Sequence, residues 1–259
     1  MIESLPDIAT LRALARADGP RVAAYPAFAS GCVSLDTALG GGLARGRLHE
    51  IFARERDAGA AAGFATMLAV RAVPPGGALL WLRTERAEAR CGALYAPGLM
   101  MLGVEPDDLL LAVLADDVAV LKAAADALGC GALGAVVIEC WGSPRVLDLT
   151  ATRRLSVAAA ASGVPALMLR LDAEPTPSAA ETRWRVTPGL SAALDAGAPG
   201  QPVLELELLR HRSGPAGVTW RVEWTHDARA LRAAPLSGAV VPAVADRPAA
   251  DREPLRHAA

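Results

Sequence analysis

Arginines alternate with aromatic side chains in two short segments of the last third of the chain. One segment holds Arg183, Trp184 and Arg185, and the other holds Arg210 and Arg212 on either side of a histidine. Guanidinium groups bind phosphates and aromatic rings stack on unpaired bases, so this pattern is typical of a single-stranded nucleic-acid surface. The same pattern also fits solvated arginines along a sheet edge, which discourage aggregation. The sequence leaves both interpretations open.

The sequence offers less support for a metal site or a catalytic nucleophile. The four cysteines lack a C-x-x-C spacing and a nearby histidine, so we expect buried, reduced thiols rather than a zinc site or a disulfide framework. His49 and Glu50 lack the second histidine of a metalloprotease motif. The acidic pairs at 107–108 and 116–117 precede elements, where N-capping is the expected role. We therefore expect no metal and no cofactor.

Composition bounds the class of protein. With 259 residues, 53% of them hydrophobic and 21% charged, the chain can bury a sizeable core, which argues against a disordered or fibrous protein. Its 26 basic and 28 acidic residues give a net charge of −2, so any nucleic-acid surface must be local. The sequence contains no membrane-length apolar run and no signal-like start, so we expect a cytoplasmic protein without a membrane partner.

The middle of the chain alternates between strand-like and helix-like segments. Compact apolar runs predict the strands, and amphipathic or alanine-rich segments between them predict the helices. The expected strands are 47–52, 77–82, 109–113, 135–138 and 166–171, and the expected helices are 34–39, 60–72, 86–102, 118–128 and 149–162. This alternation indicates right-handed βαβ units, and therefore an α/β fold with a mainly parallel sheet flanked by helices.

The pattern changes beyond residue 172. Two prolines precede three segments, 184–186, 203–209 and 218–224, that we expect to form a C-terminal antiparallel extension with a hairpin. The remaining sequence has few large apolar residues, which predicts a disordered tail. The expected organisation is an N-terminal helix and linker at 1–30, a core with its extension at 31–232, and the tail at 233–259.

Three segments carry a resemblance to a known fold family. Residues 31–51 read GCVSLDTALGGGLARGRLHEI, which resembles the entry to the RecA/RadA recombinase core. WLRTERA at 81–87 and LGVEPDDLL at 102–110 are similar to the family's second core strand and the approach to its third. The apolar run 135–140 takes the position of the Walker B strand. The resemblance covers residues 31 to 172 and implies a RecA-like fold.

The nucleotide-binding loop of that family is degenerate in this chain. A working loop needs G-x-x-x-x-G-K-[ST], with backbone N–H groups around the phosphates, a lysine on them and a hydroxyl on Mg²⁺. The corresponding stretch, 52–63, contains neither that glycine spacing nor a lysine. The loop positions that would have to hold a nucleotide are Ala53, Arg54, Arg56, Gly59 and Ala60. We therefore expect no ordinary ATP hydrolysis.

Other positions that the family uses for catalysis and for its nucleotide switch also differ in this chain. By the resemblance, Glu139 stands where the Walker B aspartate is expected and Glu85 aligns with the catalytic base, so both are expected to be vestigial. Because Glu85 lies next to Arg83 and Arg86, a surface ion pair is its expected role. Arg170 lies in the segment that replaces the family's γ-phosphate-sensing glutamine, so the ATP-driven DNA switch is expected to be absent.

One family combines these features, and the chain is identified as a member of it. A RecA-like core without a working loop, followed by segments like 182–186 and 203–212, resembles ImuA, the SOS-regulated accessory protein of bacterial translesion mutagenesis. The resemblance implies three protein partners: an inactive Y-family polymerase homologue (ImuB-type), an error-prone replicative-type DNA polymerase, and RecA. Single-stranded DNA is a further candidate, with Arg153 and Arg154 near the position of a RecA DNA-binding loop.

Two other functions remain open. The chain could be a RecA-class DNA-dependent ATPase in which Arg54 or Arg56 replaces the loop lysine. It could also be a SulA-like inhibitor of cell division, which is another binding role on a related fold.

Overall fold

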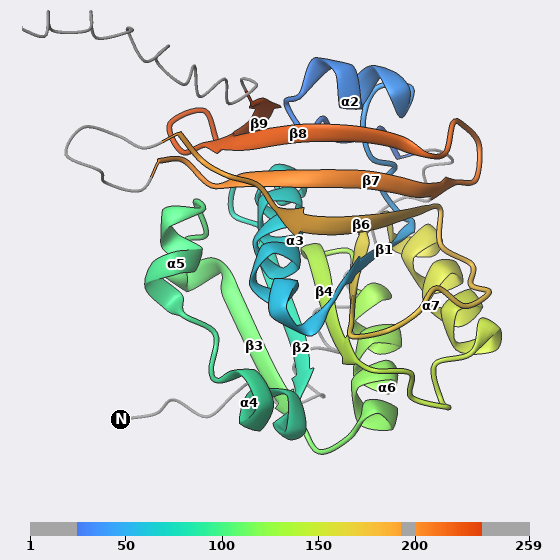
Figure 1. The fold of residues 1–259 in the computed structure, drawn as a ribbon. Helices are drawn as coiled ribbons and strands as arrows, with labels where there is room; N and C mark the ends of the chain where they lie inside the picture. Colours follow the sequence, from blue (N-terminus) through green and yellow to red (C-terminus); the bar gives the residue numbers. More distant parts are fainter. Residues whose placement is uncertain (1–24, 193–199, 235–259) are drawn as a thin grey trace, which may run out of the picture.

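The structure is a computed structural model that describes residues 25–192 and 200–234, whose strands form one twisted sheet (Figure 1). The strand order is β3-β2-β4-β5-β1-β6-β7-β8-β9. All pairings from β3 to β6 are parallel, and those from β6 to β9 are antiparallel. The strands span Leu48–Ala53 (β1), Ala78–Thr84 (β2), Leu109–Leu114 (β3), Leu133–Trp141 (β4), Ala166–Leu171 (β5), Thr182–Pro188 (β6), Val203–His211 (β7), Val218–Thr225 (β8) and Ala230–Ala233 (β9).

Helices cover both faces of the parallel part of the sheet. The core on one face is built around α3 with support from α2, and α6 and α7 pack side by side on the other face (Figure 1). The helices span Val33–Ala38 (α2), Ala58–Ala72 (α3), Glu85–Cys91 (α4), Ala96–Met101 (α5), Asp117–Leu128 (α6) and Leu149–Ser162 (α7), with 3-10 turns at Glu55–Asp57 and Pro106–Asp108. The predicted α/β class with an antiparallel extension is confirmed.

Most expected elements occur within a few residues of their predicted bounds. Capping residues explain the helix starts that were predicted most closely. The carboxylate of Asp148 accepts a hydrogen bond from the backbone of Ala151 at 2.7 Å, which starts α7 at Leu149 as predicted. Asp116 caps α6 in the same way. The capping role expected at 107–108 is wrong, because these residues lie inside a 3-10 turn without a side-chain cap.

One expected helix is divided in two. The sequence predicts a helix over 86–102, but α4 ends at Cys91 and α5 begins only at Ala96. Gly92 follows α4 with a φ of 80°, a conformation that L side chains rarely adopt and that stops the helix. After the break the chain returns, so α4 lies at the end of β2 and α5 lies near the beginning of β3 (Figure 1).

The segment around 184–186 differs from the expectation in direction. It forms the longer strand β6, which pairs parallel to β1 and is antiparallel only to β7. The ten residues from 172 to 181 span the sheet rather than forming a turn, since an extended chain of that length covers roughly 33 Å. They pass beside α7, where the backbone of Ala179 donates to the hydroxyl of Thr152. Only the pairings beyond β6 are antiparallel.

Several expectations lie outside the described residues. They are the N-terminal helix and linker up to residue 24 and the tail from residue 235. Within the described residues, no helix is long and apolar enough to cross a membrane.

A chain of hydrogen bonds joins β1 to β6 inside the core. The Trp184 indole donates to the hydroxyl of Thr182 at 2.7 Å, and that hydroxyl lies 2.8 Å from Nδ1 of His49. Nε2 of His49 lies 2.9 Å from the carbonyl of Ala44, which can only accept, so Nε2 carries the proton and Nδ1 accepts. Burial lowers the pKa of His49 from 6.5 to about 4. The imidazole is therefore neutral in the folded protein at neutral pH.

This buried histidine makes stability depend on pH. Its folded pKa lies below its unfolded pKa, so the unfolded chain gains a proton first as the pH falls below 6.5, and stability is lost until folded His49 titrates near 4. We expect the free energy of unfolding to fall by about 2 kcal/mol between pH 7 and pH 5 through this group. His49→Gln keeps a donor and an acceptor without titrating. Urea unfolding should show a smaller loss in that variant, and an equal loss in both proteins would contradict the assignment.

Candidate functional site at the carboxyl edge of the sheet

The parallel strands β1, β2, β4 and β5 all end at the same edge of the sheet. Open α/β sheets bind their ligands at this edge, because the loops that follow neighbouring strands meet there. Here the edge gathers the loop after β1, the start of α4, the end of β4 and the loop after β5. It is therefore the place where the vestigial positions can be examined together.

Glu139 is buried near the end of β4, and protein groups bind both of its oxygens. Its Oε1 accepts from the Trp141 indole at 2.8 Å and from Arg83 Nη2 at 3.2 Å, and its Oε2 accepts from the Trp81 indole at 3.0 Å. Glu139 is 3% exposed and Arg83 1%. Each charge of the pair offsets part of the cost of burying the other, and loss of either one leaves a buried charge unpaired, so the pair acts as a fixed part of the core.

This donor set does not fit the metal and nucleotide that the fold family implies. A Mg²⁺ ion needs free carboxylate oxygens, whereas those of Glu139 point at an arginine and two indoles. Glu85 is exposed at the first turn of α4, and its expected surface ion pair does not form among the described residues; Arg83 binds Glu139 instead. The loop itself offers no lysine or hydroxyl.

Arg90 ties the loops of this edge together from α4. It forms a bidentate ion pair with Glu55, at 2.8 and 2.6 Å, and a further contact with Asp172 at 3.3 Å. Its guanidinium also lies 4.7 Å from the centre of the Trp141 ring. The hydrogen bond from Arg90 lowers the pKa of Glu55. Arg90 thus links the loops after β1 and β5 to the end of β4.

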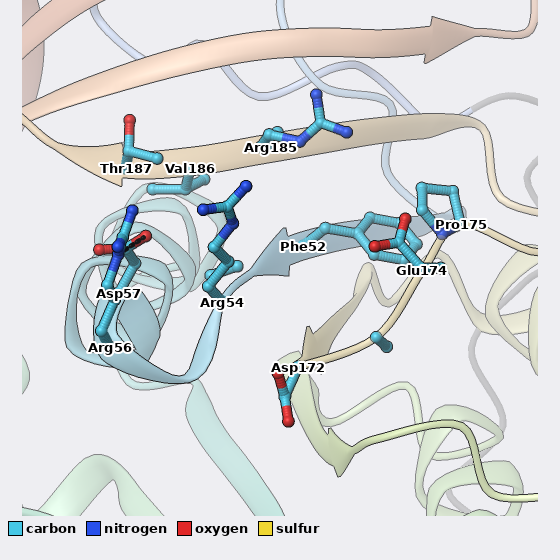
Figure 2. Close-up of a pocket in the computed structure, with 12 residues that line it drawn as sticks. Phe52, Arg54, Arg56, Asp57, Asp172, Glu174, Pro175, Arg185, Val186 and Thr187 are labelled. Atoms are coloured by element: carbon cyan, nitrogen blue, oxygen red, sulfur yellow. Dashed lines mark ion pairs between the residues drawn. The ribbon is translucent and has the colours of Figure 1, made fainter.

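A cavity of about 460 Å³ lies beside this network, where β1 and β5 end against β6 (Figure 2). Arg54 extends into it without an ion pair among the described residues, while Arg56 lies 3.7 Å from Asp57. The cavity walls carry as many carboxylates as arginines, so they offer no concentrated positive charge for a phosphate. Its charged residues are Arg54, Arg56, Arg185, Asp57, Asp172 and Glu174. Of the other loop positions, Ala53 lines the cavity, whereas Gly59 and Ala60 lie in α3.

A second buried carboxylate, Glu50, explains the position of Arg183. Glu50 is fully buried in β1 and contacts Arg170 at 3.1 Å, Arg183 at 2.9 Å and the hydroxyl of Ser178 at 2.8 Å. Arg183 also donates to the carbonyl of Thr176. The expectation that Arg183 contacts DNA or a partner is therefore wrong, because its guanidinium neutralises a carboxylate inside the fold.

Trp184 is also a core residue rather than a contact residue. It is 0% exposed, packs edge-on against Phe64 with ring centres 5.8 Å apart, and lies 5.9 Å from Trp220. The pattern that suggested base stacking places every second residue of β6 in the core. Burial of Trp184 rules out a stacking role in this fold.

The remaining arginine candidates are exposed but lie in different places. Arg185 pairs with Glu207 at 2.7 Å across β6 and β7. Arg210 and Arg212 lie at the end of β7 and just beyond it, and Arg153 and Arg154 lie on α7. Neither of these last two pairs has an ion-pair partner among the described residues. The structure therefore separates the candidates into two surfaces.

The sequence reasoning missed the partners of the buried charges. Glu50, Arg83, Glu139 and Arg170 each interrupt an otherwise apolar strand segment, and in a buried parallel strand such a charge requires a partner. That interruption was the available signal. All four cysteines are free, and three are buried as expected, but Cys91 is exposed.

The Glu139 pair yields a stability prediction. Glu139→Ala leaves Arg83 buried without its charge partner, which should lower the free energy of unfolding by about 3–5 kcal/mol. The double variant Arg83→Met/Glu139→Gln removes both charges and keeps an acceptor for the two indoles, so it should recover much of that loss. Glu85→Ala, at an exposed position, should change stability by less than about 0.5 kcal/mol. Urea denaturation measures all three, and an unchanged midpoint for Glu139→Ala would overturn the structural role.

Comparison with known proteins agrees with the fold and assigns the family. No family model matches the chain. The chain is 34% identical over 210 residues to protein ImuA from each of two strains of Caulobacter vibrioides, covering 74% of this chain and 81% of the relative. The crystal structure of the RadB recombinase matches with a TM-score of 0.53 and 18% identity, covering 80% of this chain and 100% of that chain, which shows a RecA-like fold. The chain therefore belongs to the ImuA family.

Proposed function

We propose that the chain is a non-catalytic accessory protein of SOS-induced, error-prone translesion DNA synthesis. It acts as an adaptor among an ImuB-type inactive Y-family polymerase homologue, an error-prone replicative-type DNA polymerase, RecA and DNA. The membership in the ImuA family supports this role. The observation that carries the non-catalytic part is the saturation of Glu139 by Arg83, Trp81 and Trp141.

The chemistry of the carboxyl edge favours binding over catalysis. Phosphoryl transfer depends on a phosphate cradle, a bound metal and a positioned base, and the residues at the cradle and metal positions are altered or engaged in other contacts here. Glu139 holds Arg83, Arg90 holds Glu55 and Asp172, and the cavity beside them balances positive with negative charge. An adaptor needs none of these catalytic parts, because its binding energy comes from complementary surfaces.

Deletion of the gene is expected to abolish most damage-induced mutation while leaving cell division normal. The physical reason is that an adaptor holds the mutagenic polymerase components at the lesion, so their effective concentration there falls when it is lost. Induced mutation frequency, survival and cell length in the deletion strain measure this effect. Complementation with the Arg83→Met/Glu139→Gln protein, which keeps an acceptor for the two indoles, tests whether the charges of this edge are needed for more than folding.

Different results would favour the two rival functions. A RecA-class ATPase that uses Arg54 or Arg56 should gain thermal stability from MgATP, since a ligand that binds the native state raises Tm. A SulA-like inhibitor should cause filamentation on overexpression without DNA damage. Either result, together with unchanged induced mutation in the deletion strain, would contradict the translesion proposal.

The exposed pair Arg210 and Arg212 supports direct contact with single-stranded DNA. Both guanidinium groups lack ion pairs among the described residues, so they are available to phosphates. Arg210→Ala/Arg212→Ala should weaken binding of a single-stranded oligonucleotide and lower the slope of log affinity against log salt by about 1.4. Arg185→Ala, whose guanidinium pairs with Glu207, is the matched control. Equal affinities across a salt series would remove DNA contact from this surface.

A further inference from the structure

An exposed stripe of apolar and basic side chains runs along α7. Leu149, Arg153 and Val157 follow one another at intervals of four residues, and Arg154 lies beside them. This spacing places them on one side of the helix over roughly 12 Å. Val157 is 70% exposed, although valine is usually a core residue. We call this set of residues the α7 stripe.

The stripe continues into the loop before α7 and toward the neighbouring helix. Arg145 and Val146 are exposed in that loop, Val146 at 42%. α6 packs beside α7 on the same face of the sheet (Figure 1). Val118 and Lys122 of α6 are exposed. The exposed side chains near α7 thus include both apolar and cationic residues.

The cations of this surface lack carboxylate partners among the described residues. Arg145, Arg153, Arg154 and Lys122 form no ion pair in that part of the chain. Asp148, the acidic residue nearest in sequence to Arg145, Arg153 and Arg154, uses its carboxylate to cap α7. Elsewhere in the fold, arginines such as Arg90 and Arg170 are paired. The unpaired cations therefore leave a local positive field that favours an acidic ligand.

The apolar members of the stripe favour a protein ligand over a nucleic acid. The six stripe and loop residues include no aromatic ring, so bases have nothing to stack on. Exposed valine and leucine contribute little to contact with phosphates, but their burial against a partner's apolar side chains is favourable. A straight helical row of alternating apolar and basic side chains matches a second helix laid along it.

We infer that the α7 stripe binds an acidic amphipathic helix of a protein partner. Apolar side chains of that helix pack against Leu149, Val157 and Val146, and its carboxylates pair with Arg153 and Arg154. The inference rests on the proposed adaptor function and names the chemistry of one of its partner surfaces. This surface lies on a different element from Arg210 and Arg212, so the two sets of arginines can be substituted independently.

The test uses the full chain and a labelled synthetic helical peptide with leucines along one side and glutamates flanking them. Arg153→Glu/Arg154→Glu is expected to weaken peptide binding at least tenfold, because attraction becomes repulsion. Val157→Asp should weaken it to a similar degree, because it places a charge in the apolar contact. Val157→Ala is a milder change at the same exposed site and serves as the control for misfolding of the Val157→Asp protein. Arg210→Ala/Arg212→Ala is the matched control and should bind the peptide normally.

Three further measurements separate the alternatives. A peptide in which lysines replace the glutamates should not bind, and a single-stranded oligonucleotide should bind the Arg153→Glu/Arg154→Glu protein as well as the unaltered one. Loss of oligonucleotide binding with unchanged peptide binding would overturn the inference in favour of a DNA surface. Absence of peptide binding to the unaltered protein would also overturn it.

Mutation frequency distinguishes the two proposals. A deletion strain with normal induced mutation contradicts the adaptor function itself. Full complementation by Arg153→Glu/Arg154→Glu contradicts only the role of the stripe.

Discussion

The fold depends on the neutralisation of two carboxylates inside the parallel sheet. Glu50 in β1 and Glu139 in β4 lie where water cannot reach them, and a buried charge left without its partner costs several kcal/mol. Each one therefore requires cations in fixed positions. Glu50 draws Arg170 from β5 and Arg183 from β6 to itself, and Glu139 draws Arg83 from β2. These pairs link strands that are neighbours in space but far apart in sequence.

The Glu50 pairs account for the direction of β6. Arg183 reaches Glu50 only when β6 lies beside β1 in the observed parallel register, with Arg183 opposite Glu50. The same register brings Thr182 to His49, so the two faces of β1 impose the same alignment. The ten-residue connection across the sheet costs conformational entropy, and the buried ion pairs and the hydrogen-bond chain offset part of that cost. The antiparallel extension then grows from an edge whose direction is already set.

The sequence predicted the periodic parts of this fold and few of its polar contacts. Helix α7 and strand β5 were predicted at their observed bounds because the cap at Asp148 and the apolar run 166–171 are local signals. The direction of β6 and the strand β9 depend on contacts across the sheet, which periodicity does not encode. The alternation of arginine and tryptophan in β6 predicts a surface pattern. In the structure, Arg183 and Trp184 lie on opposite faces of the strand and both are buried. Within the candidate site, the missing loop lysine was visible in the sequence, whereas the donors around Glu139 come from β2 and the end of β4 and required the fold.

The distribution of ion pairs also indicates where we expect this protein to bind other molecules. The structure uses carboxylates to hold arginines at the carboxyl edge and inside the sheet, so these arginines are not available to ligands. The exposed arginines without partners among the described residues, Arg153 and Arg154 on α7 and Arg210 and Arg212 at the end of β7, lie away from that edge. We therefore place the proposed binding surfaces on the outer faces of a helix and a hairpin rather than at the carboxyl edge, whose loops are held together by ion pairs. Surfaces of this kind select partners by charge and shape and need no bound nucleotide, which agrees with the adaptor function proposed above.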